Sequence, residues 1–187
     1  MRVFSVLTIG CLLSGCMSSA MTSANAVYDH RSIQTNVQNH YQQVSLYHAL
    51  TSNPAVNPAS DLAVVIEEHV ALIIGETPDQ ASWLAIDKEA GRFSGTQKVL
   101  NKVTIAPPVS MATKIHDTWI TTKIKTQYIA SNEINPSKIK VITDDGVVYL
   151  MGMAPREEAN KAIEVASQTE GVKKVVTALY FLDASTV

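Results

Sequence analysis

The side chains of this 187-residue chain that could carry out chemistry are few and scattered. A tetrahedral metal site needs histidine or cysteine ligands at short, regular spacing, such as two histidines at i, i+4 on one helix. No histidine pair has that spacing, and the five are His30, His40, His48, His69 and His116. No bound metal and no cofactor are therefore expected.

The acidic pairs of the sequence are better explained by turns than by catalysis. Glu67-Glu68 and Asp144-Asp145 fall at equivalent points of two apolar segments. Acidic residues are common at such positions for reasons of turn chemistry. Since no nucleophile elbow and no phosphate-cradling glycine loop occur either, the chain is not expected to be an enzyme. Nucleic acid is disfavoured as a partner by a pI near 6.2.

The two cysteines lie near the N-terminus, where "MRVFSVLTIGCLLSGC" has an apolar run too short to span a bilayer. Leu13-Ser14-Gly15-Cys16 resembles the lipobox of bacterial lipoproteins. This predicts a signal peptide over residues 1–15, a lipid-modified Cys16, and a small, polar tether over residues 16–28. Met17, where Asp would favour the inner membrane, favours the outer membrane by resemblance to lipoprotein sorting rules. The alternatives are an ordinary signal peptide with an incidental cysteine, or a buried thiol.

Comparison of the chain with itself reveals a repeat. "LAVVIEEHVALIIGETP" (62–78) aligns with "IKVITDDGVVYLMGMAP" (139–155) when Gly75 is set against Gly152. A helical pattern and an apolar strand follow each copy. Upstream of each copy lies a helical pattern with a row of apolar residues. The row Ile33, Val37 and Tyr41 is matched with the row Ile120, Ile124 and Tyr128. We therefore predict an α+β fold of two tandem units. Each has the order helix, strand, strand, helix, strand, with two helices packed on a three-stranded mixed sheet.

The repeat also predicts boundaries and turns. The first unit is expected over residues 29–106, a proline-containing connector over 107–113 and the second unit over 114–183. Asp145-Gly146 is a strong hairpin signal, and Gly152 is expected to be a second structural turn glycine. In the first copy His69 must take the place of the turn glycine. The proposed helix pairing also implies about ten inserted residues between Tyr41 and Leu62.

The segments "DTWITTKIKTQYIAS" and "IKVITDDGVVYLMGMAPREEANKAIEVASQTEGVKKVVTALYFL" resemble a BON domain (bacterial OsmY and nodulation). The order lipobox, first copy, second copy is similar to that of dual-BON outer-membrane lipoproteins. The resemblance implies a non-enzymatic lipoprotein that faces the periplasm, binds phospholipid and supports outer-membrane integrity. It also implies a membrane-binding surface on the first helix of the second unit.

Trp119 is the residue that most favours a membrane role. It stands beside the apolar row of its helix, with Lys123 four residues on and Ile115 four residues back. Residues 111–140 carry a net charge of +3, whereas residues 17–110 carry −3. An aromatic among lysines suits the headgroup layer of an anionic bilayer, such as one with phosphatidylglycerol or cardiolipin. The predicted contact residues are Ile115, Trp119, Ile120, Lys123 and Lys125.

Two alternatives stay open at this point. Trp119 could pack against the first unit or the Pro107-Pro108 connector, and Trp83 could pack between the units or belong to a protein-binding patch. The whole chain could also be an adaptor for an outer-membrane assembly or another cell-envelope complex.

Overall fold

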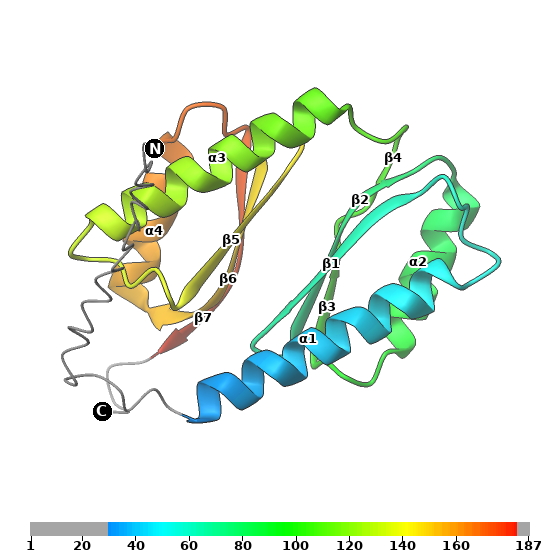
Figure 1. The fold of residues 1–187 in the computed structure, drawn as a ribbon, viewed down its shortest axis with the longest axis horizontal. Helices are drawn as coiled ribbons and strands as arrows, with labels where there is room; N and C mark the ends of the chain where they lie inside the picture. Colours follow the sequence, from blue (N-terminus) through cyan, green and yellow to red (C-terminus); the bar gives the residue numbers. More distant parts are fainter. Residues whose placement is uncertain (1–29, 183–187) are drawn as a thin grey trace, which may run out of the picture.

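The computed structural model describes residues 30–182 and contains two units in tandem (Figure 1). The first consists of α1 (His30–Thr51), β1 (Asp61–Glu67), β2 (Val70–Thr77), α2 (Gln80–Arg92), β3 (Lys98–Asn101) and the short β4 (Thr104–Ile105). The second consists of α3 (Met111–Ala130), β5 (Ile139–Asp144), β6 (Val147–Pro155), α4 (Arg156–Gln168) and β7 (Lys174–Leu182). The predicted α+β fold and its order of elements are confirmed. The signal segment and Cys16 lie outside the described residues.

Both sheets are mixed, as predicted. In the first unit β1 pairs antiparallel with β2, and β2 pairs parallel with β3 and β4. In the second, β5 pairs antiparallel with β6, and β6 pairs parallel with β7. β1 and β5 are therefore edge strands of their sheets. The first helix of each unit packs against that edge strand.

The two hairpin turns use positive φ angles at both central residues. Asp145 and Gly146 have φ of 43° and 74°, and Glu68 and His69 have 45° and 61°. This is the backbone of a two-residue hairpin loop, which confirms that His69 replaces the turn glycine. Gly152 is not a turn residue, contrary to expectation. It lies within β6 at φ 123°, where a Cβ would come 2.2 Å from the Lys138 carbonyl oxygen.

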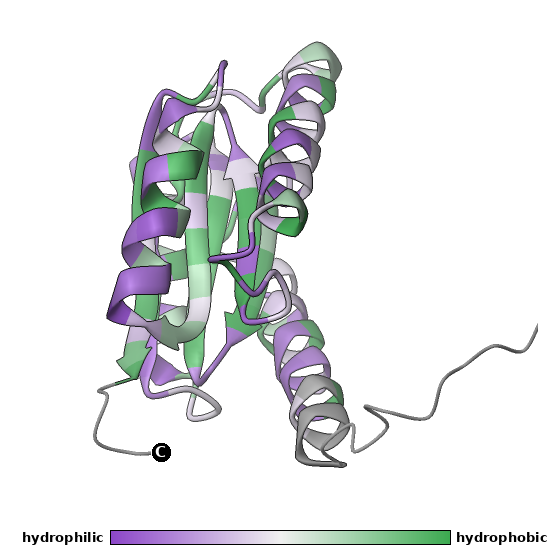
Figure 2. Ribbon diagram, turned by 90° about the vertical axis from the view of Figure 1, so that its left-hand side faces the viewer, coloured by the Kyte–Doolittle hydropathy of each residue, from purple (hydrophilic) through white to green (hydrophobic). Residues whose placement is uncertain are grey.

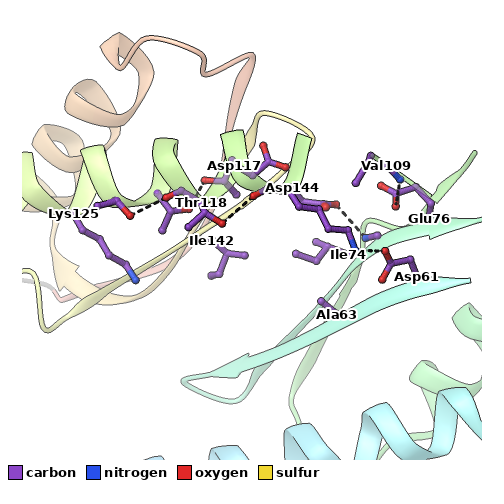
Figure 3. Close-up of a pocket in the computed structure, with 15 residues that line it drawn as sticks. Asp61, Ala63, Ile74, Glu76, Val109, Asp117, Thr118, Lys125, Ile142 and Asp144 are labelled. Carbon is purple, nitrogen blue, oxygen red and sulfur yellow. Dashed lines mark hydrogen bonds and ion pairs between the residues drawn. The ribbon is translucent and has the colours of Figure 1, made fainter. Parts of the chain in front are cut away.

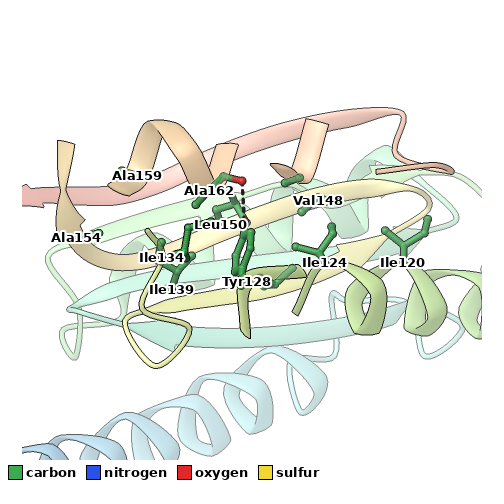
Figure 4. Packing of buried hydrophobic residues seen from close by; sticks show 12 residues of the cluster. Ile120, Ile124, Tyr128, Ile134, Ile139, Val148, Leu150, Ala154, Ala159 and Ala162 are labelled. Atoms are coloured by element: carbon green, nitrogen blue, oxygen red, sulfur yellow. Dashed lines mark hydrogen bonds between the residues drawn. The ribbon is translucent and has the colours of Figure 1, made fainter. Parts of the chain in front are cut away.

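The core of the second unit lies between its helices and its sheet (Figure 4). Ile120, Ile124 and Tyr128 are all 0% exposed, and they share one face of α3 because they recur every fourth residue. The Tyr128 hydroxyl donates to the Ala162 carbonyl of α4 at 2.8 Å. Burial raises the pKa of this phenol.

The helix pairing predicted for the first unit is wrong. Val37 and Tyr41 are 65% and 74% exposed, whereas Leu46 and Leu50 are fully buried. Leu46 and Leu50 are therefore the counterparts of Ile124 and Tyr128. The error arose because α1 carries apolar residues at helical spacing on two opposite faces, and periodicity alone does not say which face is buried.

The correct register removes the predicted ten-residue insertion. Leu50 precedes Leu62 by 12 positions, and Tyr128 precedes Ile139 by 11. It also changes the partner of Trp119. The wrong pairing, which matches Ile33 with Ile120, also sets Ser32 against Trp119, whereas the corrected pairing sets Tyr41 there. The side chains of Ser32, Ile33 and Asn36 are not among those that the structure describes.

The units pack through the sheet faces that their own helices leave uncovered. Leu72 and Ile74 of β2 meet Tyr149 and Met151 of β6 in a separate apolar cluster. Burial there raises the pKa of Tyr149 to about 12. The molecule thus has helices outside and two sheets inside. α3 lies above the sheets and α1 below them in Figure 1, and both follow the right-hand edge in Figure 2.

Candidate functional site

α3 is fixed firmly at its start and at its middle. The Ser110 side chain accepts a hydrogen bond from the Thr113 backbone N–H at 3.2 Å and caps the helix. The carboxylate of Asp117, only 5% exposed, accepts from the backbone N–H groups of Asp145 and Gly146 at 2.9 and 2.8 Å. The helix is thereby tied to the hairpin turn of its own sheet.

The face of α3 that points away from the sheet is also apolar. We call Met111, Ile115, Trp119 and Ile129 the outer stripe of α3; they are 70%, 64%, 44% and 72% exposed. Such a set of large apolar side chains is unusual on a helix that already buries an apolar face. The outer stripe is thus the first candidate for a binding surface.

Threonines beside the outer stripe turn their hydroxyl groups inward. The hydroxyls of Thr118, Thr122 and Thr126 donate to the carbonyls four residues earlier, at 2.9, 2.8 and 2.9 Å. Each hydroxyl is satisfied by its own helix, as happens to threonine in helices that contact apolar surroundings. Three polar residues therefore add little polarity to this face.

The Trp119 ring is held by its own helix. It stacks on His116 with a centroid distance of 5.6 Å and an interplanar angle of 16°. The Lys123 ammonium lies 4.4 Å from its centroid and also pairs with Glu170 at 3.0 Å. These contacts do not support packing of Trp119 against the first unit or the connector, and 44% of the residue stays exposed.

The structure separates the five residues predicted for the contact surface. Ile115, Trp119 and Lys123 lie together on the outer side of α3. Ile120 is 0% exposed within the core, so it does not touch any external surface. Lys125 is exposed on the other flank, where it lines a cleft between the units.

That cleft, about 470 Å³ in volume, lies between α3 and the strands of both units (Figure 3). Lys114 of α3 pairs with Asp61 of β1, and the Asp144 carboxylate accepts from the Gly75 backbone N–H at 3.1 Å. Burial raises the pKa of Asp144. Neither copy alone contains this cluster, so it could not be predicted from the sequence.

Glu76 closes the same cleft from the connector side. Its side chain, 3% exposed, accepts from the Val109 backbone N–H at 3.3 Å. Burial raises the pKa of Glu76, although the Val109 hydrogen bond opposes that shift. The connector is therefore attached to the first unit by a buried carboxylate.

Two further hollows continue along β1, with volumes of about 330 and 340 Å³. The first shares Ala63 with the cleft and is walled by Val44 and Tyr47 of α1; the second reaches Asn39 and Lys140. Lys140 pairs there with Glu67 of the other unit at 3.0 Å. The sequence did not predict that Val44 and Tyr47 line a hollow, because the wrong face of α1 was assigned to the core.

Trp83 belongs to neither of the surfaces expected for it. Its indole N–H donates to the Val103 carbonyl at 2.9 Å, and the ring packs against the core of the first unit. Within residues 30–182, no helix has the length and hydropathy needed to cross a membrane.

The repeated architecture agrees with the sequence comparison. The BON domain model matches residues 42–107 and 116–181, so the chain belongs to the BON-domain family. It is 26% identical to the outer membrane lipoprotein DolP of Haemophilus influenzae over 91% of each chain. It is 27% identical to the 21 kDa hemolysin of Actinobacillus pleuropneumoniae, over 82% of this chain and 79% of that one. It is 28% identical to osmotically-inducible protein Y of Escherichia coli, over 63% of this chain and 60% of that one.

Proposed function

We propose that this chain is a lipid-anchored outer-membrane lipoprotein that faces the periplasm. In this proposal it binds anionic phospholipid through the outer stripe of α3 and supports outer-membrane integrity without catalysing a reaction. The similarity to an outer membrane lipoprotein over 91% of both chains supports the location. The Leu13-Ser14-Gly15-Cys16 motif supports the lipid anchor at Cys16.

The observation that carries the lipid-binding part is the exposed outer stripe with Trp119 at its centre. Trp119 and Ile115 project from a helix whose opposite face already supplies the core. Their side chains do not contribute to that core, so a binding role accounts for their apolar character better than a structural one.

The energies are suited to a site that orients an anchored protein. Burial of a large apolar side chain contributes roughly 2 kcal/mol, and each lysine near an anionic surface contributes about 1 kcal/mol. The lipid on Cys16 would supply attachment. The outer stripe would then set the orientation and the preference for lipid charge.

Flotation on vesicles tests the proposal. Residues 18–187 contain every described element and no cysteine. This fragment is expected to float with vesicles that contain phosphatidylglycerol or cardiolipin, and not with purely zwitterionic ones. Trp119→Ser should strongly reduce flotation. Leu84→Ser, which removes a 54% exposed leucine from α2, is the matched control and should float like wild type.

A second candidate function is supported by the cleft and the hollows beside β1. An edge strand flanked by hollows can receive an extended segment of a partner protein. If wild type fails to float with any vesicle, or Trp119→Ser floats equally well, an adaptor for an outer-membrane assembly or cell-envelope complex becomes the better account.

A further inference from the structure

α1 repeats the exposed apolar face of α3. With Leu46 and Leu50 set against Ile124 and Tyr128, Tyr41 takes the place of Trp119 and Val37 that of Ile115. Val37 and Ile115 are 65% and 64% exposed, so the equivalence extends to their environment. We call the exposed pair Val37 and Tyr41 the outer stripe of α1. Val44 and Tyr47, the counterparts of Thr122 and Lys125, lie on the other flank and wall the hollow beside β1.

The charge of α1 is compatible with an anionic surface. The 22-residue helix contains one arginine and three histidines but no aspartate or glutamate. α3 contains a single carboxylate, Asp117, which is buried against the hairpin turn. Neither outer stripe therefore carries an exposed acid of its own helix that would repel lipid phosphate.

The place of α1 in the chain brings it near a membrane if Cys16 is lipid-modified. Residues 17–29 separate Cys16 from the first residue of α1, and they span at most about 50 Å when fully extended. α1 and α3 run along the same edge of the molecule in Figure 2, but they lie on opposite sides of the two sheets in Figure 1, so their outer stripes face away from each other. The tether is long enough for the outer stripe of α1 to reach the leaflet that holds the anchor.

We propose that the outer stripe of α1 is a second membrane-contacting surface, centred on Tyr41. This inference rests on the proposed function, because it takes the same bilayer as the binding partner. Because the two outer stripes face away from each other, each is a separate contact, and a molecule presents one of them at a time to a flat bilayer. Loss of a buried tyrosine contact should weaken binding by about tenfold, the change that corresponds to roughly 1.4 kcal/mol.

Single-cysteine labelling separates this inference from the proposed function. The fragment of residues 18–187 lacks cysteine, so an environment-sensitive nitrobenzoxadiazole dye can be placed at one site at a time. The sites are Val37→Cys on α1, Ile115→Cys on α3 and Leu84→Cys on α2, which replace residues of similar exposure. Tyr41 and Trp119 stay intact in all three proteins.

Vesicles with 20% phosphatidylglycerol should shift the dye emission to shorter wavelength at positions 37 and 115, but not at 84. Adding Tyr41→Ser to the Val37→Cys protein should reduce that shift and weaken binding. A shift at 115 without one at 37 would overturn this inference and leave the proposed function standing. A shift at 37 alone would support the inference and remove α3 from the site. No shift at any position, or an equal shift at 84, would overturn both.

Discussion

Tyr41 and Trp119 occupy equivalent positions on the first helices of the two units. Tyr41 lies five positions before the fully buried Leu46, and Trp119 lies five positions before its counterpart Ile124. Both aromatic side chains point away from the core of their own unit. A BON unit in this chain thus buries one face of its first helix and leaves an aromatic residue on the other. The second unit adds lysines around its aromatic residue and the first does not.

Glu170 should restrain lipid binding. Its carboxylate, 81% exposed, pairs with Lys123 at 3.0 Å beside the Trp119 ring. Glu170→Gln removes a negative charge next to the outer stripe of α3, and one charge near an anionic surface corresponds to about 1 kcal/mol. We expect several-fold tighter binding to vesicles with phosphatidylglycerol, measured by titration at low salt. Glu164→Gln on α4 is the control, and equal tightening there would show a non-specific charge effect.

Ile120 should affect stability and not lipid binding. Because its side chain is fully buried, Ile120→Val should cost about 1 kcal/mol of unfolding free energy. Flotation measured well below the melting temperature should not change. Ile115→Val is the exposed counterpart, for which denaturant unfolding should be unaltered. A selective loss of lipid binding in folded Ile120→Val would contradict the burial argument.

Exchange between aspartate and asparagine should have opposite effects on stability at Asp117 of α3 and at Asn39 of α1. Both Asp117 oxygens accept from turn N–H groups, so Asp117→Asn places an amide donor against a backbone donor and should cost about 1–3 kcal/mol.

Asn39 lies at the same position in α1, and its buried side-chain NH₂ group has no hydrogen-bond partner among the described residues. Asn39→Asp supplies an acceptor towards the turn at Glu68 and His69, and it should raise the melting temperature. Calorimetry of both variants checks the pair. A lower melting temperature for Asn39→Asp would show that the two turns are not held alike.

Asp144 should contribute stability to the protein on acidification. Burial raises the pKa of its carboxyl group, so the folded state binds the proton more tightly than the unfolded state does. This contribution to stability is present below the ordinary pKa, about 3.9, and is lost as the pH rises through the raised value. Asp144→Asn stays neutral and keeps an acceptor for the Gly75 N–H. It should therefore melt higher than wild type at pH 7 and gain less on acidification.

Asp145→Asn is the matched control for that prediction, since Asp145 is the exposed neighbour that pairs with Lys173. Thermal melts between pH 7 and pH 3 compare the three proteins. An unchanged pH profile in Asp144→Asn would place the titration elsewhere, with Glu76 as the next group to replace.

The strands and turns of both units could be predicted because their signals are local. Gly75 and Gly152 aligned the two copies correctly because they hold the same strand position, although Gly152 was wrongly expected to be a turn residue. A Cβ at Gly75 or Gly152 would come 1.9 or 2.2 Å from the carbonyl oxygen of Asp61 or Lys138. The Asp145-Gly146 turn was equally plain. Where the backbone needs a positive φ or has no room for a Cβ, the sequence has glycine, and this signal can be recognised without the tertiary structure.

The face of α1 could not be predicted in the same way. Its apolar residues fall at helical spacing on both sides, so Val37 and Tyr41 matched the core pattern as well as Leu46 and Leu50 did. Only packing against β1 decides between the sides. The cleft at Asp61, Lys114 and Asp144 was hidden for a related reason, because it forms only when the two sheets meet.

The central claim is that Trp119 enters the headgroup layer of an anionic bilayer. The fluorescence of Trp119 in a Trp83→Phe fragment of residues 18–187 tests it most directly, since these are the only two tryptophans. We predict a shift to shorter wavelength with phosphatidylglycerol vesicles, and quenching that is stronger by shallow than by deep spin-labelled lipids. A fragment that binds the vesicles while its emission stays unchanged and unquenched would contradict the account.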